Sequence, residues 1–355
     1  MEYNRLGDYI EPVDERNSKL EIKLSQGICN EKYFQDPRQV AENSTADKIV
    51  RQGYFAYNRA TTRNGEKISI AYREGPDCTV SSAYQVFKIK DEEKLNPKYL
   101  LMWYKRSDFD RYARFKSHGS AHEFFEYEEM CDVKLPIPSI TRQREIVSEY
   151  ETLTNRIRLN NQMIQHLEAT AQTLYRKTFV DNIDKENLPE GWRMGTLGDI
   201  AEINSGKTCI DKSEIKDDIY QYPVAGASGI IGFSSTYNYD EKLMTTGRVG
   251  TLGVVNRYNQ KMYMADNVLI IRSNYYEYCY QILKSLDYSE ITKGGVQSLI
   301  TQTDLKDYSI TLPSEEILST FEKQSGTLYS SVEIKEQENE KLTELQSLLL
   351  AKMGQ

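Results

Sequence analysis

Apolar residues recur at two different spacings along this chain, and the change of spacing divides it. Residues 1–138 and 187–313 hold short β-branched and aromatic runs between turn formers, which is the pattern of strands. The runs lie at 54–58, 68–72, 84–90, 252–256, 262–264 and 268–272. Each region also holds one apolar stretch typical of a helix, at 96–104 and at 275–286, and Asn96 is a suitable N-cap for the first. The pattern predicts two α+β units in which strands dominate.

After each of these regions, apolar residues follow alternating steps of four and three, which predicts a coiled coil. Each helix has about 39 residues and so spans roughly 58 Å at 1.5 Å per residue. A lone helix of this kind is marginally stable, so we expect the two to pack on each other. The expected pairing positions are Ile146, Leu153, Ile157, Asn160, Ile164, Leu167, Leu174, Leu328, Val332, Lys335, Leu342 and Leu349. In an antiparallel pair, Asn160 and Lys335 fall near the middle and fix the register.

The two halves of the chain are copies of each other. Residues 119–138 align with residues 294–313 at an offset of 175, which places Pro138 on Pro313. The offset continues through the helix that follows, where Leu153 falls on Leu328. The predicted parts are a first domain (1–139), a first helix with its linker (140–186), a second domain (187–313) and a second helix (314–355). Such a pseudo-two-fold molecule suits a bipartite target better than a single small substrate.

Composition narrows the class of protein. The chain carries a formal net charge of -8 and a mean hydropathy of -0.64. No apolar run approaches the ~18 residues of a membrane span, so we expect a cytoplasmic protein that does not contact a membrane. The five cysteines are scattered without a Cys-x-x-Cys pair, which predicts reduced thiols and no zinc site. No nucleophile–base pair or metal cluster stands out, so the sequence predicts no enzyme active site.

The acidic net charge at first argues against nucleic acid, but its distribution does not. Residues 48–73 hold six basic residues against Glu66 alone, and residues 242–272 hold five against Asp266 alone. Such windows occur on ordinary solvated faces. Their presence in both copies nevertheless favours contact with phosphates.

Candidate contact residues follow from side-chain chemistry. Arginine commonly reads guanine and asparagine reads adenine, whereas lysine and tyrosine bond to phosphates. The base-reading candidates are Asn58, Arg59, Arg63, Arg73, Arg248, Asn256 and Arg257. The phosphate candidates are Tyr57, Lys67, Lys261 and Lys293, and the aligned loop residues His122 and Gln297 are further candidates. Each of these residues could equally be an ordinary surface side chain.

The tetrapeptide Ser-Gly-Lys-Thr at 205–208 has the ending of a nucleotide-binding loop. The full motif needs a glycine five positions before Gly206, and Ala201 stands there. We therefore exclude nucleotide binding. Two readings remain open: a loop that presents Ser205, Lys207 and Thr208 to DNA, or an ordinary turn between strands.

Five segments carry a family resemblance. They are L-P-E-G-W-R-M-G-T-L-G-D-I-A-E-I-N-S-G-K-T (188–208), G-G-V-Q-S-L-I-T-Q-T-D-L-K-D-Y-S-I-T-L-P (294–313), F-A-Y-N-R-A (55–60), L-N-P-K-Y-L (95–100) and L-P-I-P-S-I-T-R-Q-R-E-I-V (135–147). In this order they resemble the specificity subunit of Type I DNA restriction–modification systems. The resemblance implies an α+β fold, with two pseudo-symmetric target recognition domains joined by two long antiparallel coiled-coil helices.

The resemblance also implies a function. The chain would be a non-catalytic reader of double-stranded DNA, with one domain for each half of a split site and the helices as a ruler between them. Two methyltransferase subunits, which use S-adenosylmethionine, would bind the helices. Restriction–translocase subunits, which use ATP and Mg²⁺, could join them, and this chain itself would hold no cofactor. The alternative from another class is a coiled-coil protein scaffold that never touches DNA.

Overall fold

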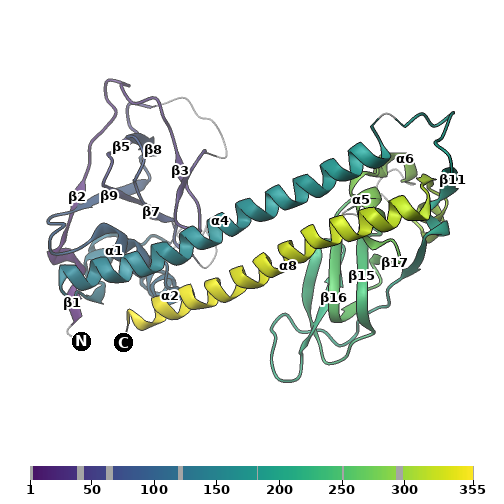
Figure 1. Ribbon diagram of the computed structural model, residues 1–355. Coiled ribbons are helices and arrows are strands. Elements are labelled where there is room, and N and C mark those ends of the chain that lie inside the picture. The colour runs from purple at the N-terminus through teal and green to yellow at the C-terminus, as the bar shows by residue number, and fades with distance from the viewer. Residues whose placement is uncertain are drawn as a thin grey trace. The chain divides into compact units, whose positions relative to one another are not determined.

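The structure is a computed structural model that describes residues 3–37, 44–60, 67–118, 123–181, 183–249, 252–292 and 299–354. The chain forms two compact units. Unit 1 comprises Met1–Asn160 with Gln337–Gln355, and unit 2 comprises Asn161–Glu336. Each unit contains one strand-rich domain and a segment of each of two long helices, α4 and α8 (Figure 1).

Unit 1 is built around a four-stranded antiparallel sheet in the order β2–β9–β6–β7, accompanied by the pairs β1–β10, β3–β4 and β5–β8. Its strands are β1 (Tyr3–Arg5), β2 (Ile10–Val13), β3 (Gly27–Ile28), β4 (Phe34–Gln35), β5 (Lys48–Val50), β6 (Phe55–Asn58), β7 (Ile70–Tyr72), β8 (Cys78–Val80), β9 (Tyr84–Ile89) and β10 (Lys134–Pro136). Its helices before α4 are η1 (Leu6–Asp8), α1 (Pro97–Tyr104), α2 (Ser107–Lys116) and α3 (Tyr127–Cys131). Asn96 caps α1 as predicted, because its side chain accepts hydrogen bonds from two backbone N–H groups.

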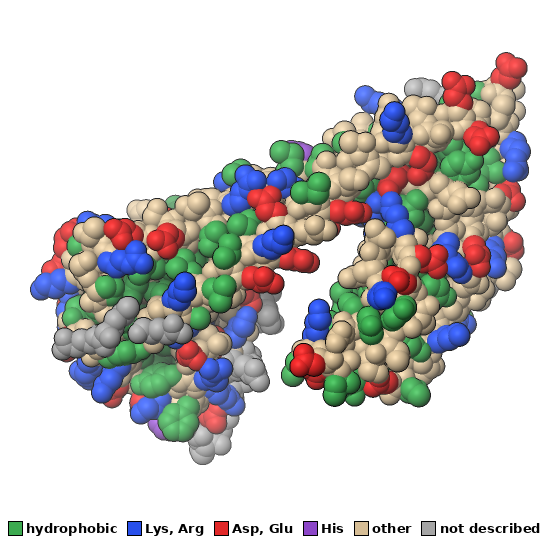
Figure 2. Space-filling view, turned by 60° about the horizontal axis from the view of Figure 1, so that its bottom comes forward, with side chains coloured by type: hydrophobic (Ala, Val, Ile, Leu, Met, Phe, Trp, Pro, Cys, Tyr) green, Lys and Arg blue, Asp and Glu red, His purple; other side chains and the backbone are tan. Residues whose placement is uncertain are grey.

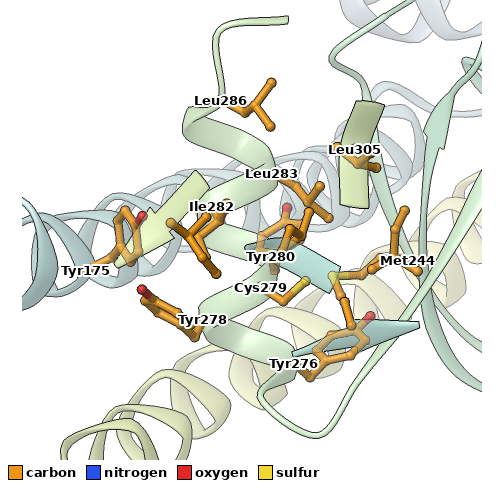
Figure 3. Packing of buried hydrophobic residues seen from close by; sticks show 14 of the residues in the cluster. Tyr175, Met244, Tyr276, Tyr278, Cys279, Tyr280, Ile282, Leu283, Leu286 and Leu305 are labelled. Atoms are coloured by element: carbon orange, nitrogen blue, oxygen red, sulfur yellow. The ribbon is translucent and has the colours of Figure 1, made fainter. Parts of the chain in front are cut away.

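Unit 2 is built around a six-stranded sheet in the order β12–β17–β15–β16–β13–β14, accompanied by the pair β11–β18. Its strands are β11 (Arg193–Thr196), β12 (Ala201–Ser205), β13 (Tyr222–Gly226), β14 (Gly229–Ser234), β15 (Tyr239–Gly247), β16 (Val255–Met264), β17 (Val268–Ser273) and β18 (Ser309–Leu312). Its short helices are η2 (Leu197–Asp199), α5 (Tyr276–Ser285), α6 (Tyr288–Ile291) and α7 (Gln302–Lys306). The side chains of α5 fill the centre of its core, among them Tyr278, Cys279 and Leu283 (Figure 3).

The long helices have the predicted length. Helix α4 (Ile140–Phe179) has 40 residues and α8 (Glu315–Lys352) has 38. In unit 1 the two helices run antiparallel, since Thr154 bonds to Gln346 and Asn160 bonds to Asn339. The sequence pairs Asn160 with Lys335, whereas the structure pairs the buried Asn160 with Asn339 at 3.0 Å, one turn further along α8.

Seven of the other predicted pairing positions lie in or against one of the two cores. Ile146 and Leu349 pack against the core of unit 1. Positions packed in or against the core of unit 2 are Ile164, Leu167, Leu174, Leu328 and Val332. Leu153, Ile157 and Leu342 are half-buried.

The duplication is visible element by element. Each domain begins with a strand, a 3₁₀ turn of sequence Leu-Gly-Asp and a second strand, at 3–13 and at 193–205. Helices α3 and α7 are related by the predicted repeat offset, and each leads into a strand that pairs with the first strand of its domain. The predicted α+β fold with two repeated domains and two long helices is therefore confirmed.

Each long helix also caps the helix of the domain before it. In unit 1, Gln143 on α4 is fully buried and accepts a hydrogen bond from the N–H of Asn96 at 2.8 Å. In unit 2, Glu322 on α8 accepts hydrogen bonds from the N–H groups of Glu277 and Tyr278, at 3.0 and 2.8 Å. The helix dipole favours the Glu322 carboxylate at the N-terminus of α5. Both contacts satisfy backbone N–H groups at a helix start and so fix a domain helix to the long helix that follows it.

Candidate nucleic-acid interface

Four strands of unit 2 end in one row. Ser205 of β12 pairs with Leu269 of β17, Leu269 pairs with Thr246 of β15, and Thr246 pairs with Val255 of β16. The residues just beyond this row therefore project from one end of the sheet. We call this end, with Lys207, Arg248 and Asn267, the unit 2 edge.

The Ser-Gly-Lys-Thr segment lies at the unit 2 edge. The N–H of Lys207 donates to the carbonyl of Met264 at 3.0 Å, and the Lys207 side chain is exposed. A side chain at Gly206 would place its Cβ only 1.9 Å from the carbonyl oxygen of Ala265, so glycine is required for this close approach. The Thr208 hydroxyl is bound to Asp266 at 2.7 Å. No helix follows this segment directly, whereas a nucleotide-binding loop leads into one.

Arg248 is held at the unit 2 edge by its backbone. Its N–H donates to the carbonyl of Asn267 at 2.9 Å, and its own carbonyl accepts from the N–H of Ile300 at 3.0 Å. Its neighbour Val249 forms a bridge with Leu299. These contacts bring together segments that lie far apart in the sequence, an association that local pattern reasoning does not reach.

The same frame recurs in unit 1 around Arg59. The carbonyl of Arg59 accepts from the N–H of Phe125 at 2.9 Å, and Ala60 forms a bridge with Phe124. Phe125 and Ile300 are related by the repeat offset. Arg59 and Arg248 therefore occupy equivalent positions in the two repeats. We call the end of the unit 1 sheet that carries Arg59 the unit 1 edge.

Unpaired polar groups gather at the unit 2 edge. The buried side-chain atoms without a hydrogen-bond partner among the described residues include Arg248 Nε, Asn256 Nδ2 and Asn267 Oδ1. Asn256 lies one residue inside the row, opposite Thr245. Buried polar groups are nearly always paired in folded proteins, so such a group of exceptions is typical of a functional site.

Some predicted contact residues lie in the interior instead. Tyr57 is fully buried and its ring packs against Phe87 and Phe125, which leaves it no path to a phosphate. Arg73 is 6% exposed and donates to the carbonyl of Pro76 and to Gln26. Both residues are core elements of unit 1, so neither belongs to the candidate interface.

Arg257 is also a structural residue. Its guanidinium makes two hydrogen bonds to Glu277, at 2.6 and 2.9 Å, and lies 4.0 Å from the ring centroid of Tyr329. Its side chain is only 15% exposed. The sequence groups Arg257 with the basic stretch around it, but its partners come from α5 and α8. The structure therefore places the Arg257 guanidinium in packing contacts with these helices and not at the unit 2 edge.

The remaining candidates lie at the surface with protein partners. Lys67 pairs with Glu31 at 2.8 Å, and Lys261 lies 3.9 Å from Asp240. The Asn58 side chain accepts from the N–H of Ala60, which fixes the turn at the unit 1 edge. Arg63, His122, Lys293 and Gln297 lie outside the described residues.

Sequence reasoning missed two residues of the unit 2 edge. Asn267 holds the backbone of Arg248, and Gln302 donates from Nε2 to the Ser205 hydroxyl at 2.9 Å. Gln302 opens α7, and the repeat aligns it with Tyr127, so the alignment offers no polar counterpart. Only the fold brings these residues to the edge.

Charges of both signs are interspersed over the surface. On the face drawn in Figure 2, lysine and arginine side chains lie beside aspartate and glutamate side chains in both units. Ion pairs are frequent among the described residues, and most of them involve exposed side chains. A described cation without such a pair, such as Arg248, is therefore informative. No helix among the described residues is long and apolar enough to span a membrane.

Comparison with known proteins identifies the family. The family described as Type I restriction modification DNA specificity domain matches residues 40–169 and 189–344, which is most of the chain. This chain belongs to that family. The two matched ranges correspond to the two repeats, and the family consists of specificity subunits that are not themselves catalytic. The expectations of family and of a non-catalytic subunit are confirmed.

Individual relatives agree. The chain is 20% identical to the specificity subunit of the Type I restriction enzyme HindI from Haemophilus influenzae, over 87% of each chain. It is 21% identical to the specificity subunit of the Type I restriction enzyme MjaIX from Methanocaldococcus jannaschii, over 72% of this chain and 67% of the relative. The crystal structure of the Type I restriction–modification S subunit from M. genitalium superposes with a TM-score of 0.62 at 14% identity, over 100% of this chain and 96% of that one, and so shares the fold.

Proposed function

We propose that this specificity subunit reads a split double-stranded DNA site, with the unit 1 edge on one half-site and the unit 2 edge on the other. The equivalence of Arg59 and Arg248 carries the proposal. The planar guanidinium suits both phosphate oxygens and the O6/N7 pair of guanine, and each arginine stands at a strand end fixed by matching backbone bonds. A duplicated reader fits a target that has two parts.

The long helices are the proposed site for methyltransferase subunits. In unit 1 a groove of about 500 Å³ lies between α4 and α8. Leu345 and Leu348 line it and are 50% and 59% exposed. Exposed leucines in a groove favour an apolar partner surface. The methyltransferase would supply S-adenosylmethionine, and restriction–translocase subunits would supply the ATP and Mg²⁺ chemistry.

The net charge of the chain bears on its affinity for DNA, and the length of α4 bears on the spacing of the two half-sites. The net charge of -8 opposes a polyanion, so we expect the chain alone to bind DNA weakly and its partners to supply much of the positive field. The 40 residues of α4 extend for about 60 Å. We propose that this length sets the gap between the half-sites.

Sequencing of methylated adenines in single DNA molecules tests the proposal. Cells would express the methyltransferase subunits of the same system with this chain, and control cells would express those subunits without it. We expect a split motif that is methylated only when the chain is present. An active methyltransferase that gains no new motif from the chain would contradict the proposal and favour a protein scaffold.

A further inference from the structure

The two edges differ in the residue that follows the N–H donor to the arginine carbonyl, which is Phe125 in unit 1 and Ile300 in unit 2. Position 126 in unit 1 is Glu126, and the repeat places Thr301 at the equivalent position in unit 2. The Glu126 carboxylate accepts a hydrogen bond from Nη1 of Arg59 at 3.1 Å. The Thr301 hydroxyl instead accepts from the N–H of Asp304 at 3.1 Å and donates to the Asp304 carboxylate at 2.6 Å, which caps α7. The position that holds a carboxylate bonded to the arginine in unit 1 thus holds a neutral threonine in unit 2, and the nearby Asp304 carboxylate is bonded to that threonine.

The guanidinium of Arg59 is occupied on several sides. Besides its bond to Glu126, Nε donates to the carbonyl of Ala83 at 3.2 Å, and the group lies 5.8 Å from the ring centroid of Phe124. Its side chain is 35% exposed and that of Glu126 is 47% exposed, so solvent and a ligand can reach the pair. Arg248 has no ion-pair partner among the residues with described coordinates, and its Nε lacks an acceptor there.

Given the proposed DNA-reading function, on which this inference rests, we propose that Glu126 is an electrostatic latch on Arg59. The carboxylate occupies the guanidinium that the unit 1 edge would offer to a DNA phosphate, and its own charge repels that phosphate. A phosphate must replace the carboxylate before Arg59 contributes to binding. Unit 2 has no such carboxylate at the equivalent position, so its edge engages DNA more readily.

The latch is weak enough to open. The pair is partly exposed to solvent, and ion pairs of this kind are worth a factor of about two to five in an equilibrium. Other contacts between the protein and a bound DNA duplex can therefore offset the free energy needed to break the ion pair between Glu126 and Arg59. Arg59 therefore contributes to DNA binding only when a phosphate of the DNA backbone lies where it can replace the Glu126 carboxylate.

Glu126→Gln in the full chain tests the latch. Fluorescence anisotropy with random-sequence duplex DNA, measured over a series of NaCl concentrations, gives both the affinity and its salt dependence. Removal of the carboxylate should tighten binding about two- to fivefold and steepen the slope of log K against log salt by about 0.9, the release expected for one added phosphate contact.

Glu11→Gln is the matched control. Glu11 lies on β2, pairs with Lys88 at 2.9 Å and is 44% exposed, so this variant makes the same charge change on a similar ion pair. Lys88 lies four residues along β9 from Tyr84, which pairs with Asn58 at the unit 1 edge. We expect the control to leave the slope unchanged. Equal effects of the two variants would overturn the latch.

Two further variants separate failure of the latch from failure of the proposed function. Combining Arg59→Ala with Glu126→Gln should abolish the gain, because the gain requires the released guanidinium. If Arg248→Ala weakens binding but Glu126→Gln does not strengthen it, the latch alone is wrong. If neither arginine substitution changes binding, the proposed reading edges are wrong as well.

Discussion

The two repeats share the backbone arrangement around Arg59 and Arg248, but they place ion pairs at different sites. Unit 1 has an ion pair at its edge, and unit 2 has one where its domain helix meets the long helix. At the edges, Arg59 of unit 1 is paired with Glu126, whereas Arg248 of unit 2 has no ion-pair partner within the described part of the chain. We call the contact between the start of a domain helix and the long helix that follows it a joint. At the joint of unit 1, the neutral Gln143 of α4 accepts the hydrogen bond from Asn96. Unit 2 buries Glu277 beneath Arg257 at the same place in its fold, next to Glu322.

This difference shows that a duplicated fold does not fix its electrostatics. The backbone bond to the carbonyl of Arg59 has its counterpart at Arg248, since the two N–H groups that donate to the arginine carbonyls are related by the repeat offset. The side chains around them are free to vary. At the joint of unit 2, Arg257 and Glu277 are paired within the core. At the unit 2 edge, Arg248 has no ion-pair partner among the described residues. Substitutions at the joints and edges test this division, beginning with the largest expected effect.

Glu277→Ala should destabilise unit 2 strongly. Glu277 is 2% exposed, and its removal leaves the mostly buried Arg257 guanidinium with Glu333 alone, at 4.0 Å, in place of two hydrogen bonds to Glu277, which costs about 3–5 kcal/mol. Denaturant unfolding followed by the fluorescence of Trp192, in a Trp103→Phe background, reports on unit 2.

The joint of unit 1 provides the comparison. Asn96→Ala removes the neutral side-chain cap of α1 but keeps the backbone N–H that donates to Gln143, and it should cost only about 1 kcal/mol, measured by Trp103 in a Trp192→Phe background. Similar losses at the two joints would show that the buried charge in unit 2 has no special weight.

Arg248→Ala should weaken DNA binding more than Arg59→Ala. Loss of an arginine contact to a base or phosphate costs about 1–3 kcal/mol, so we expect at least a fivefold loss at position 248. Arg59 already has a partner in the free protein, so its removal should cost less than about threefold, by the modest worth of an exposed pair. Anisotropy at low salt measures both, and a larger loss for Arg59→Ala would reverse the comparison.

The smallest expected effect concerns pH. The stability of unit 2 should depend on the titration of Glu322, whereas the equivalent contact of unit 1, made by Gln143, should show no such dependence. Burial raises the pKa of the Glu322 carboxyl above its ordinary value of 4.5. A carboxyl whose pKa is raised by folding stabilises the fold below the ordinary pKa and loses that contribution as the pH rises through the raised value. The stability of the wild type relative to Glu322→Gln should therefore fall as the pH rises from about 4.5.

The neutral joint gives the control for this titration. Gln143 does not titrate, so the stability difference between the wild type and Gln143→Ala should stay constant over the same range. A Glu322→Gln difference that is equally flat would show that burial of this carboxyl does not control the stability of unit 2.

Periodicity and repetition made much of the fold predictable. The heptad pattern predicted two helices of about 39 residues, and they have 40 and 38. The N-cap at Asn96 and the strand runs also follow from local rules, which depend on neighbours within a few residues. These features need no knowledge of distant contacts.

The edge residues were only partly predictable, because their partners are distant in sequence. The segments that bind the carbonyls of Arg59 and Arg248 are related by the repeat offset, but the two arginines are further apart than that offset. The alignment of the repeats therefore does not place one arginine on the other. Arg257 looked like a free cation because Glu277 lies twenty residues later, on another element. Arg73 was misplaced for the same reason, since its acceptor Gln26 precedes it by 47 residues.

The central claim is that the two equivalent edges contact opposite halves of one split DNA site. A photo-crosslinking residue would replace the arginine in Arg59→p-benzoylphenylalanine and Arg248→p-benzoylphenylalanine, and Glu11→p-benzoylphenylalanine would serve as the control. The DNA would carry the split motif found by methylation sequencing, and the crosslinked bases would be mapped. We predict crosslinks from position 59 in one half-site and from position 248 in the other. Crosslinks from both positions to the same half-site, or yields no higher than the control, would contradict the account.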